Sequence, residues 1–251
     1  MLINFGKSIF LAALFSLITI SNIFAGDFYW VGNNGNWNNA THWSNTSGGA
    51  GGAGVPSAND DVYFDSNSFS KPNQTVTISN NVSLHNFIIQ ENKIDFTIQS
   101  SPSIKMDIYG NVDVRANFTN EIEGSIYFKS NENIDHVMYF GWFKWKANFY
   151  FDGAGTYKFN SPLQAHDNSV NFIRGSINLY GNDILCNSFN SISTQKRKLV
   201  SKGSAILAYN SFKTTKTKSN YDFSQTKIYV ISSDLNAVDK GGDNYSITQA
   251  A

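Results

Sequence analysis

The sequence predicts an all-β fold and, within that class, a right-handed parallel β-helix with an N-terminal cap. Three observations indicate this. After the first 25 residues, apolar positions never sustain the helical spacing i, i+3, i+4, i+7. Short runs of β-branched and aromatic residues recur about every ten residues instead, and pairs of runs form a loose repeat of roughly twenty. The Asn-Gly and Asp-Gly turns that are typical of hairpins are scarce between the runs.

The runs alternate between apolar and polar residues, so one set of side chains points inward and the other faces water. Each run is bounded by Gly, Asn, Asp or Ser, which favour turns. The clearest runs are Thr75–Ile78, His85–Gln90, Asp95–Gln99, Lys105–Tyr109, Asn111–Val114, Gly124–Lys129, Ala147–Asp152, Gly155–Asn160, Ser169–Ile173, Ser176–Tyr180, Ser204–Tyr209 and Lys227–Ile231. In a parallel β-helix, each of these would stack on the coil before it at ~4.8 Å.

An antiparallel β-sandwich or jelly roll is the alternative, because short β-runs at regular spacing suit it as well. A sandwich needs tight turns between closely spaced runs, and Asp152-Gly153 is the one clear hairpin dipeptide there. The tripeptide Tyr-Gly-Asn occurs twice in similar positions, at residues 109–111 and 180–182. We therefore expect the parallel arrangement.

The N-terminus has the pattern of a signal peptide over residues 1–25. Lys7 supplies a basic start, Ser8–Ile20 is an apolar run, and Ser21–Ala25 ends in a small residue suited to cleavage. The run is shorter than the ~20 apolar residues of a membrane-spanning helix. We expect an exported protein, extracellular, at the cell surface or periplasmic, with no stable membrane insertion of the mature chain.

Residues 26–70 are predicted to cap the solenoid, and residues 71–251 to form its coils. An open end of a β-helix is a template for aggregation, so it needs covering. Trp30, Trp37 and Trp43 lie in a glycine-rich segment suited to this role, because indoles cover apolar area while their N–H groups find partners. No comparable segment follows at the C-terminus, so we expect the reading frame to be truncated.

Composition excludes several classes of function. Lys plus Arg and Asp plus Glu number 19 each, so the net charge is zero and no nucleic-acid partner is expected. Charged residues make up 15% of the chain, below the typical ~25%. Asn, Ser, Thr, Gly and aromatic residues replace them, as in exported β-proteins. Cys186 is the single cysteine, which excludes an intramolecular disulfide, and it lies in an apolar run where we expect burial.

The densest aromatic cluster is the candidate ligand-binding site. It comprises Tyr139, Trp142, Phe143 and Trp145. If Trp142 and Trp145 face outward, their rings offer stacking platforms for sugar, and a solvent-exposed aromatic patch marks a binding surface. The alternative is that these rings fill a coil interior or a loop folded over a neighbouring coil.

No catalytic residues are predicted. A polysaccharide hydrolase needs two converging carboxylates, and Asp60-Asp61 is the one acidic pair of the mature chain. No metal site or other cofactor is predicted either, because His42, His85, His136 and His166 lack ligand spacing. Calcium held by Asp60, Asp61 and Asp65 is conceivable, although these side chains are better explained as turn caps.

Several segments carry a family likeness. They are Tyr29–Gly32, Gly35–Trp37, His42–Ser44, Ser47–Pro56, Asp60–Phe69, Gly124–Ser130, Phe149–Gly153, Gly175–Tyr180, Ser188–Ser191 and Arg197–Leu199. In these segments the chain resembles the N-terminal region of large adhesin-like repeat proteins exported by Bacteroidetes, which are associated with gliding motility or type IX secretion. It is also similar to the opening of autotransporter-type β-helices. The resemblance implies a cell-surface β-helix without an assigned activity.

The expected function is that of a secreted or cell-surface, non-enzymatic protein whose solenoid presents side chains to glycan, matrix or other cells. Two alternatives stay open. One is a carbohydrate-active β-helix enzyme, a polysaccharide lyase or hydrolase, which a carboxylate pair on one solvent-facing sheet would favour. The other is a purely structural stalk with no ligand of its own.

Overall fold

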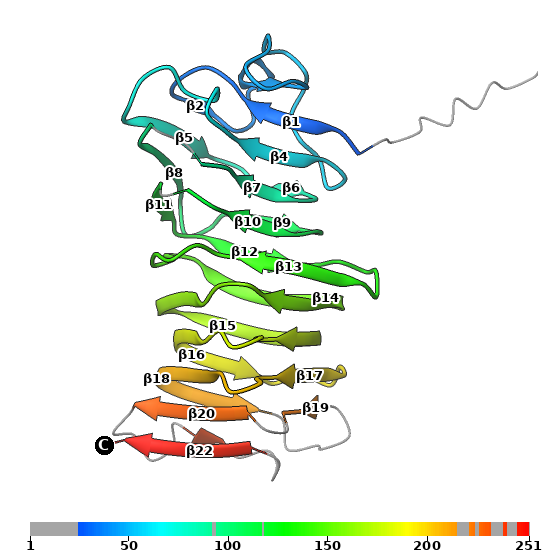
Figure 1. Cartoon of the computed structure of the whole chain (residues 1–251), viewed down its shortest axis with the longest axis vertical. Helices are drawn as coiled ribbons and strands as arrows, with labels where there is room; N and C mark the ends of the chain where they lie inside the picture. The colour runs from blue at the N-terminus through cyan, green and yellow to red at the C-terminus, as the bar shows by residue number, and fades with distance from the viewer. Residues whose placement is uncertain are drawn as a thin grey trace, which may run out of the picture.

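The chain folds as a parallel β-solenoid, as the sequence predicts (Figure 1). The computed structural model describes residues 25–91, 94–116, 118–214, 221–223, 226–231, 238–239 and 245–250. The predicted signal peptide lies outside the described residues up to residue 24. Among the described pairings, the parallel arrangement holds throughout except between β1 and the short strand β3 at the N-terminal end. The antiparallel sandwich is therefore wrong.

Each coil runs through three faces, which we call A, B and C. Face A contains β2 (Gly35–Asn36), β5 (Gln74–Ile78), β8 (Phe96–Ser100), β11 (Thr119–Ile122), the first parts of β15 (Leu163–Asn178), β16 (Ile184–Ser191) and β18 (Ala205–Thr214), then β20 (Thr226–Ile231) and β22 (Tyr245–Ala250). Face B contains β6 (Val82–Leu84), β9 (Lys105–Ile108), β12 (Ser125–Phe128), the first part of β14 (Asn148–Phe159), the later parts of β15, β16 and β18, and β21 (Val238–Asp239). Face C contains β1 (Asp27–Trp30), β4 (Asp61–Phe64), β7 (Phe87–Ile89), β10 (Val112–Val114), β13 (Asp135–Tyr139), the last parts of β14 and β15, β17 (Arg197–Val200) and β19 (Tyr221–Asp222).

The coil period is close to the repeat of roughly twenty residues that the sequence suggested. Stacked partners lie 25 residues apart at Asn86 and Asn111 on face C, and 21 apart at Leu163 and Ile184 on face A. The sequence suggested pairs of runs, however, whereas each coil contains three strands. Further along the chain, β14 and β15 turn the corners without a break, so that β14 pairs with both β12 and β13.

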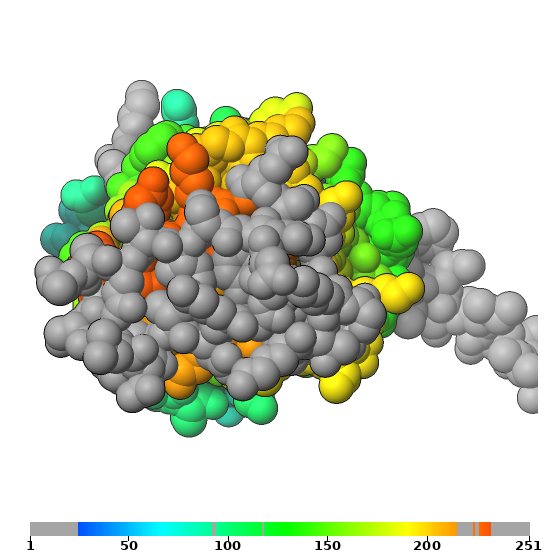
Figure 2. Space-filling model, turned by 90° about the horizontal axis from the view of Figure 1, so that it is seen from below, coloured from blue at the N-terminus to red at the C-terminus, as the bar shows by residue number. Residues whose placement is uncertain are grey.

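Inward-facing apolar residues stack from coil to coil and form one continuous core. On face B, for example, Phe128 stacks on Phe151 with ring centroids 4.8 Å apart, and Phe189 stacks on Phe212 at 5.4 Å. These distances match the coil spacing, so alternation within each strand becomes a stacked interior. Cys186 is fully buried in β16. Viewed from below in Figure 2, the coloured atoms of successive coils lie one behind another.

The three predicted cap tryptophans lie together at the N-terminal end of the solenoid. Near them are the 3-10 helix η1 (Ala40–His42) and β3 (Trp43–Ser44), which pairs with β1. The rings of Trp30 and Trp37 each meet the ring of Trp43 edge to face, at 5.2 and 4.8 Å, and all three indoles are buried. Trp43 Nε1 donates to the carbonyl of Trp37, while the other two indole N–H groups find no acceptor among the described residues. The expectation that each indole N–H is partnered is therefore correct for Trp43 alone.

Asn and Asp side chains at the corners tie neighbouring coils together. The side-chain oxygens of these residues accept hydrogen bonds from backbone N–H groups one coil further on. The pairs are Asn81 with Lys105, Asn148 with Ser169, and Asp183 with Ala205, at 2.8–2.9 Å. Such bonds satisfy backbone donors where the chain leaves one face for the next. No helix in the described part of the chain has the length and hydropathy of a membrane span.

Candidate functional site

The structure separates the two tryptophans of the predicted aromatic site. Trp142 is 67% exposed, whereas Trp145 is 3% exposed and donates its Nε1 hydrogen to the carbonyl of Phe140. Gly141, with φ of 75°, turns the chain directly before Trp142. Phe143 packs against Trp145 at the edge of the core. Trp145 is therefore a core residue and offers no stacking platform to an external ligand, which corrects the expectation for that residue.

Trp142 is linked to a cluster of polar and aromatic side chains on face C. Its Nε1 donates to the hydroxyl of Tyr139 at 3.1 Å. The guanidinium of Arg115, from the coil before, lies over the Tyr139 ring at 4.5 Å and pairs with Asp113. A cation over an aromatic face is an attractive contact that fixes the ring. Half of the predicted cluster, Tyr139 and Trp142, is thus held in place at the surface.

A shallow hollow of about 450 Å³ lies beside this cluster on face C. It is formed by β4, β7, β10 and β13, and we call it the face C hollow. Its lining residues are Asp61, Tyr63, Asn86, Ile88, Gln90, Asn111, Val112, Asp113 and Val137. Two carboxylates, three carboxamides, one phenol and three aliphatic side chains therefore surround one concave surface.

Two stacked tyrosines border the hollow on its N-terminal side. Tyr29 and Tyr63 are register partners in β1 and β4, and their ring centroids lie 4.7 Å apart at an interplanar angle of 15°. Because the separation equals the coil spacing, the rings face each other along the solenoid axis. Burial, with Asp27 and Asp61 nearby, raises the pKa of the Tyr63 hydroxyl, which therefore stays protonated and able to donate.

The floor of the hollow is a ladder of polar side chains. Asp61 Oδ1 accepts from Asn86 Nδ2 at 2.8 Å, and Asn86 Oδ1 accepts from the backbone N–H of Asn111 at 2.6 Å. His85 Nδ1 also lies 2.8 Å from Asp61 Oδ1. Each amide is oriented by its neighbour, so the carboxamide groups of the floor are fixed before any ligand arrives.

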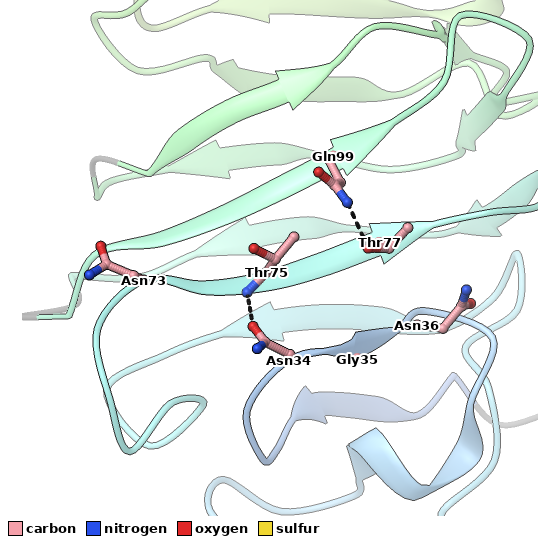
Figure 3. A pocket seen from close by; sticks show the side chains of 7 residues that line it. All are labelled: Asn34, Gly35, Asn36, Asn73, Thr75, Thr77 and Gln99. Atoms are coloured by element: carbon pink, nitrogen blue, oxygen red, sulfur yellow. Dashed lines mark hydrogen bonds between the residues drawn. The ribbon is translucent and has the colours of Figure 1, made fainter.

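A second hollow, of about 550 Å³, lies on face A between β2, β5 and β8 (Figure 3). Its lining is uncharged and contains no aromatic ring: Asn34, Gly35, Asn36, Asn73, Thr75, Thr77 and Gln99. Asn34 Oδ1 accepts from the backbone N–H of Thr75 at 2.6 Å, and Gln99 Nε2 donates to Thr77 Oγ1 at 3.0 Å. Several of its polar groups therefore already pair with one another, and the hollow lacks an apolar contact surface.

Of the three aspartates considered for calcium, Asp60 and Asp65 serve as caps, whereas Asp61 pairs with the side chains of His85 and Asn86. Asp60 Oδ2 accepts from the backbone N–H and the hydroxyl of Ser57, at 2.8 and 2.7 Å. Asp65 Oδ1 accepts from the backbone N–H of Asn67 at 2.9 Å. Within the described ranges, no three His, Cys, Asp or Glu side chains gather as a metal site.

The residues of the face C hollow come from four coils, and among them only Asp61 was considered from the sequence, as a possible member of a carboxylate pair or calcium ligand. Tyr63, Ile88, Asp113 and Tyr139 form one row across neighbouring strands. The signal for this row is their similar spacing along the chain, which becomes visible only once the coil length is known. No family model, no curated protein and no solved structure matches this chain.

Proposed function

We propose that this protein is an exported, adhesin-like binding protein that uses the face C hollow to hold an uncharged glycan. The observation that carries the proposal is the pairing of aromatic rings with oriented amides. Tyr63 lines one side of the hollow, and Asn86 and Asn111 form its floor. Asp113 lines the other side and is the register neighbour of Tyr139, which accepts a hydrogen bond from Trp142.

Sugar rings have apolar C–H faces and a rim of hydroxyl groups. An aromatic ring binds the face, and carboxamide, carboxylate and guanidinium groups exchange hydrogen bonds with the rim. The face C hollow offers both kinds of group on a rigid sheet. A binding site built on strands whose side chains are already hydrogen-bonded loses little conformational entropy when a ligand arrives.

Export and a surface location remain part of the proposal. They are supported by the signal-peptide pattern of residues 1–25 and by the resemblance to exported Bacteroidetes adhesin-like repeat proteins. A stacked solenoid suits this role because it is stiff and displays side chains at regular intervals along its faces.

The test is retention of the predicted mature chain, Gly26 to Ala251, on insoluble cellulose, mannan and xylan, with the anionic polysaccharide pectate as a chemical control. We expect retention on a neutral polysaccharide that Tyr63→Ala and Trp142→Ala each weaken. Tyr150→Ala is the matched control, because it removes one ring of an equivalent stacked pair, Tyr127 with Tyr150 at 4.3 Å, outside the hollow. Absence of retention by a folded wild-type chain would favour a purely structural stalk.

A carbohydrate-active enzyme is the second candidate, because Asp61 and Asp113 both line the hollow. Glycoside hydrolysis uses two carboxyl groups on opposite sides of the scissile bond. Here, however, both groups already have partners, His85 and Asn86 for Asp61 and Arg115 for Asp113. Release of reducing ends from the bound polysaccharide, abolished by Asp113→Asn, would replace the binding proposal with this one.

A further inference from the structure

The outward-pointing side chains on face C differ in length, and this difference forms a slot that runs across the solenoid axis. Along the row formed by Tyr63, Ile88, Asp113 and Tyr139, the two ends are long aromatic side chains and the two middle positions are shorter. Tyr29 covers one face of the Tyr63 ring, so the other face is turned toward the β7 coil. Tyrosine reaches further from the sheet than isoleucine, which leaves the outer part of that ring face open.

The slot is wide enough for one sugar ring. Tyr63 and Tyr139 are three coil spacings apart, about 14 Å. Arg115 lies 4.5 Å from the centre of the Tyr139 ring. About 10 Å then remains between the Tyr63 ring and the guanidinium, and a ring stacked on both sides at van der Waals contact needs about 7.5 Å.

From this geometry we infer that the ligand lies across the solenoid axis, with one sugar ring between the Tyr63 ring and the Arg115 guanidinium. The inference rests on the proposed glycan-binding function and adds the direction of the chain. Because the Tyr63 ring stacks on Tyr29 of the neighbouring coil, its other face is turned along the axis, and a sugar stacked on that face extends its glycosidic bonds across the axis. Tyr63 and Tyr139 block extension along the axis in both directions.

The groups along the slot set the length and charge of the ligand. Asn86 lies at one end of the slot and Gln90 at the other, four residues along the strand, or about 13 Å. This is the length of a di- to trisaccharide. Asp61 and Asp113 give the slot two carboxylates, which disfavour uronic acid or sulfated sugars.

A glycan that runs along the solenoid axis would contact other residues. The next exposed aromatic side chain beyond Tyr139 on face C is Tyr180, which follows the last part of β15 and has Lys202 over its ring at 4.6 Å. A glycan that ran along the axis would reach Tyr180 and would gain affinity with every added unit. A glycan in the slot does neither.

The experiment is calorimetric titration of the predicted mature chain with gluco-, manno- and xylo-oligosaccharides from disaccharide to octasaccharide. We expect affinity to rise up to the trisaccharide and then stay constant. Tyr63→Ala should weaken binding by about tenfold, Tyr63→Phe should retain it, and Tyr150→Ala and Tyr180→Ala should leave it unchanged. Tyr63→Leu is a second variant without the ring, in case Tyr63→Ala is less stable.

The possible outcomes separate this inference from the function on which it rests. If affinity continues to grow to the hexasaccharide and beyond, or if Tyr180→Ala weakens binding, the transverse arrangement is wrong and glycan binding stands. Unchanged binding by folded Tyr63→Ala and Tyr63→Leu would overturn the stacking on Tyr63. If none of the three oligosaccharide series binds, the proposed function fails and the slot with it.

Discussion

Asn86 and Asn111 are joined across two coils by a hydrogen bond of 2.6 Å, from the backbone N–H of Asn111 to the side-chain oxygen of Asn86. The pattern repeats one coil further, where the side-chain oxygen of Asn111 accepts from the backbone N–H of Val137 at 2.7 Å. The side chains on the floor of the face C hollow therefore also form hydrogen bonds between neighbouring coils. The candidate site and the stability of the solenoid depend on the same residues.

Asn86→Ala should destabilise the protein by about 1–3 kcal/mol, because it leaves the Asn111 N–H without its acceptor and removes a donor to Asp61. Urea unfolding followed by circular dichroism measures this change. Asn160→Ala is the matched control, since Asn160 is exposed on the same side of the solenoid. Equal unfolding midpoints for the two variants would show that the ladder contributes nothing.

The two tryptophans near residue 142 should respond in opposite ways to truncation. Trp145→Ala removes a buried ring that contacts Phe140 and Phe149 and should cost about 3–5 kcal/mol. Trp142→Ala should change the free energy of unfolding by less than about 0.5 kcal/mol, because the ring is mostly in solvent. Thermal unfolding of both variants measures the difference. A stable Trp145→Ala protein would contradict its placement in the core.

His136 should make the protein less stable in mild acid. It is 2% exposed, its Nε2 has no partner among the described residues, and it stacks on Tyr157. Burial, followed by the nearby His85, lowers the pKa of His136, although Glu132 and Asp135 oppose the shift. As the pH falls, His136 is therefore protonated in the unfolded chain before it is protonated in the folded protein. Stability is therefore complete above the unfolded pKa of about 6.5 and falls as the pH drops toward the lowered native pKa.

His136→Phe keeps a ring against Tyr157 and removes the titration, so its unfolding midpoint should vary less between about pH 7.5 and about pH 5 than that of the wild type. The same substitution at His166 is the control. Burial lowers its pKa as well, but its side chain is only partly buried. If His136→Phe shows the same loss of stability in acid as the wild type, other groups cause it.

Cys186 should be inert in the native protein. Burial raises the pKa of its thiol, and the thiolate is the reactive form. Iodoacetamide at about pH 8 should therefore leave native protein unmodified and alkylate it fully in denaturant, as read by intact mass. Ile192→Cys, at an exposed position, provides the positive control. Rapid alkylation of native wild-type protein would place Cys186 at the surface.

The parallel stacking could be predicted from the sequence because alternation and spacing are local properties. The number of strands in one coil could not. Strand β14 shows the reason. Its buried and partly exposed residues alternate without interruption from Asn148 to Phe159, although the strand passes from face B to face C within this range. Side-chain size and polarity repeat on both sides of such a corner, so the sequence alone does not show it.

The site was only partly predictable for a related reason. Tyr139 and Trp142 stood out as members of an aromatic cluster. Trp145, three residues further along the chain, is the same residue type as Trp142 but is buried instead of exposed. The packing of the coil, which the sequence pattern does not show, leaves Trp142 exposed and buries Trp145. Tyr63 and Ile88 could not be assigned at all, because they become neighbours only through the register of β4 and β7.

Trp142 reports whether a glycan occupies the face C hollow, because its indole is hydrogen-bonded to Tyr139 beside the hollow. Four of the five tryptophans are buried, so Trp142 dominates collisional quenching of the native fluorescence by acrylamide. We expect the polysaccharide retained in the binding test to protect wild-type fluorescence from acrylamide, and Trp142→Phe to abolish the protection. A bound glycan that leaves quenching unchanged, or protection that persists in Trp142→Phe, would place the ligand elsewhere on the solenoid.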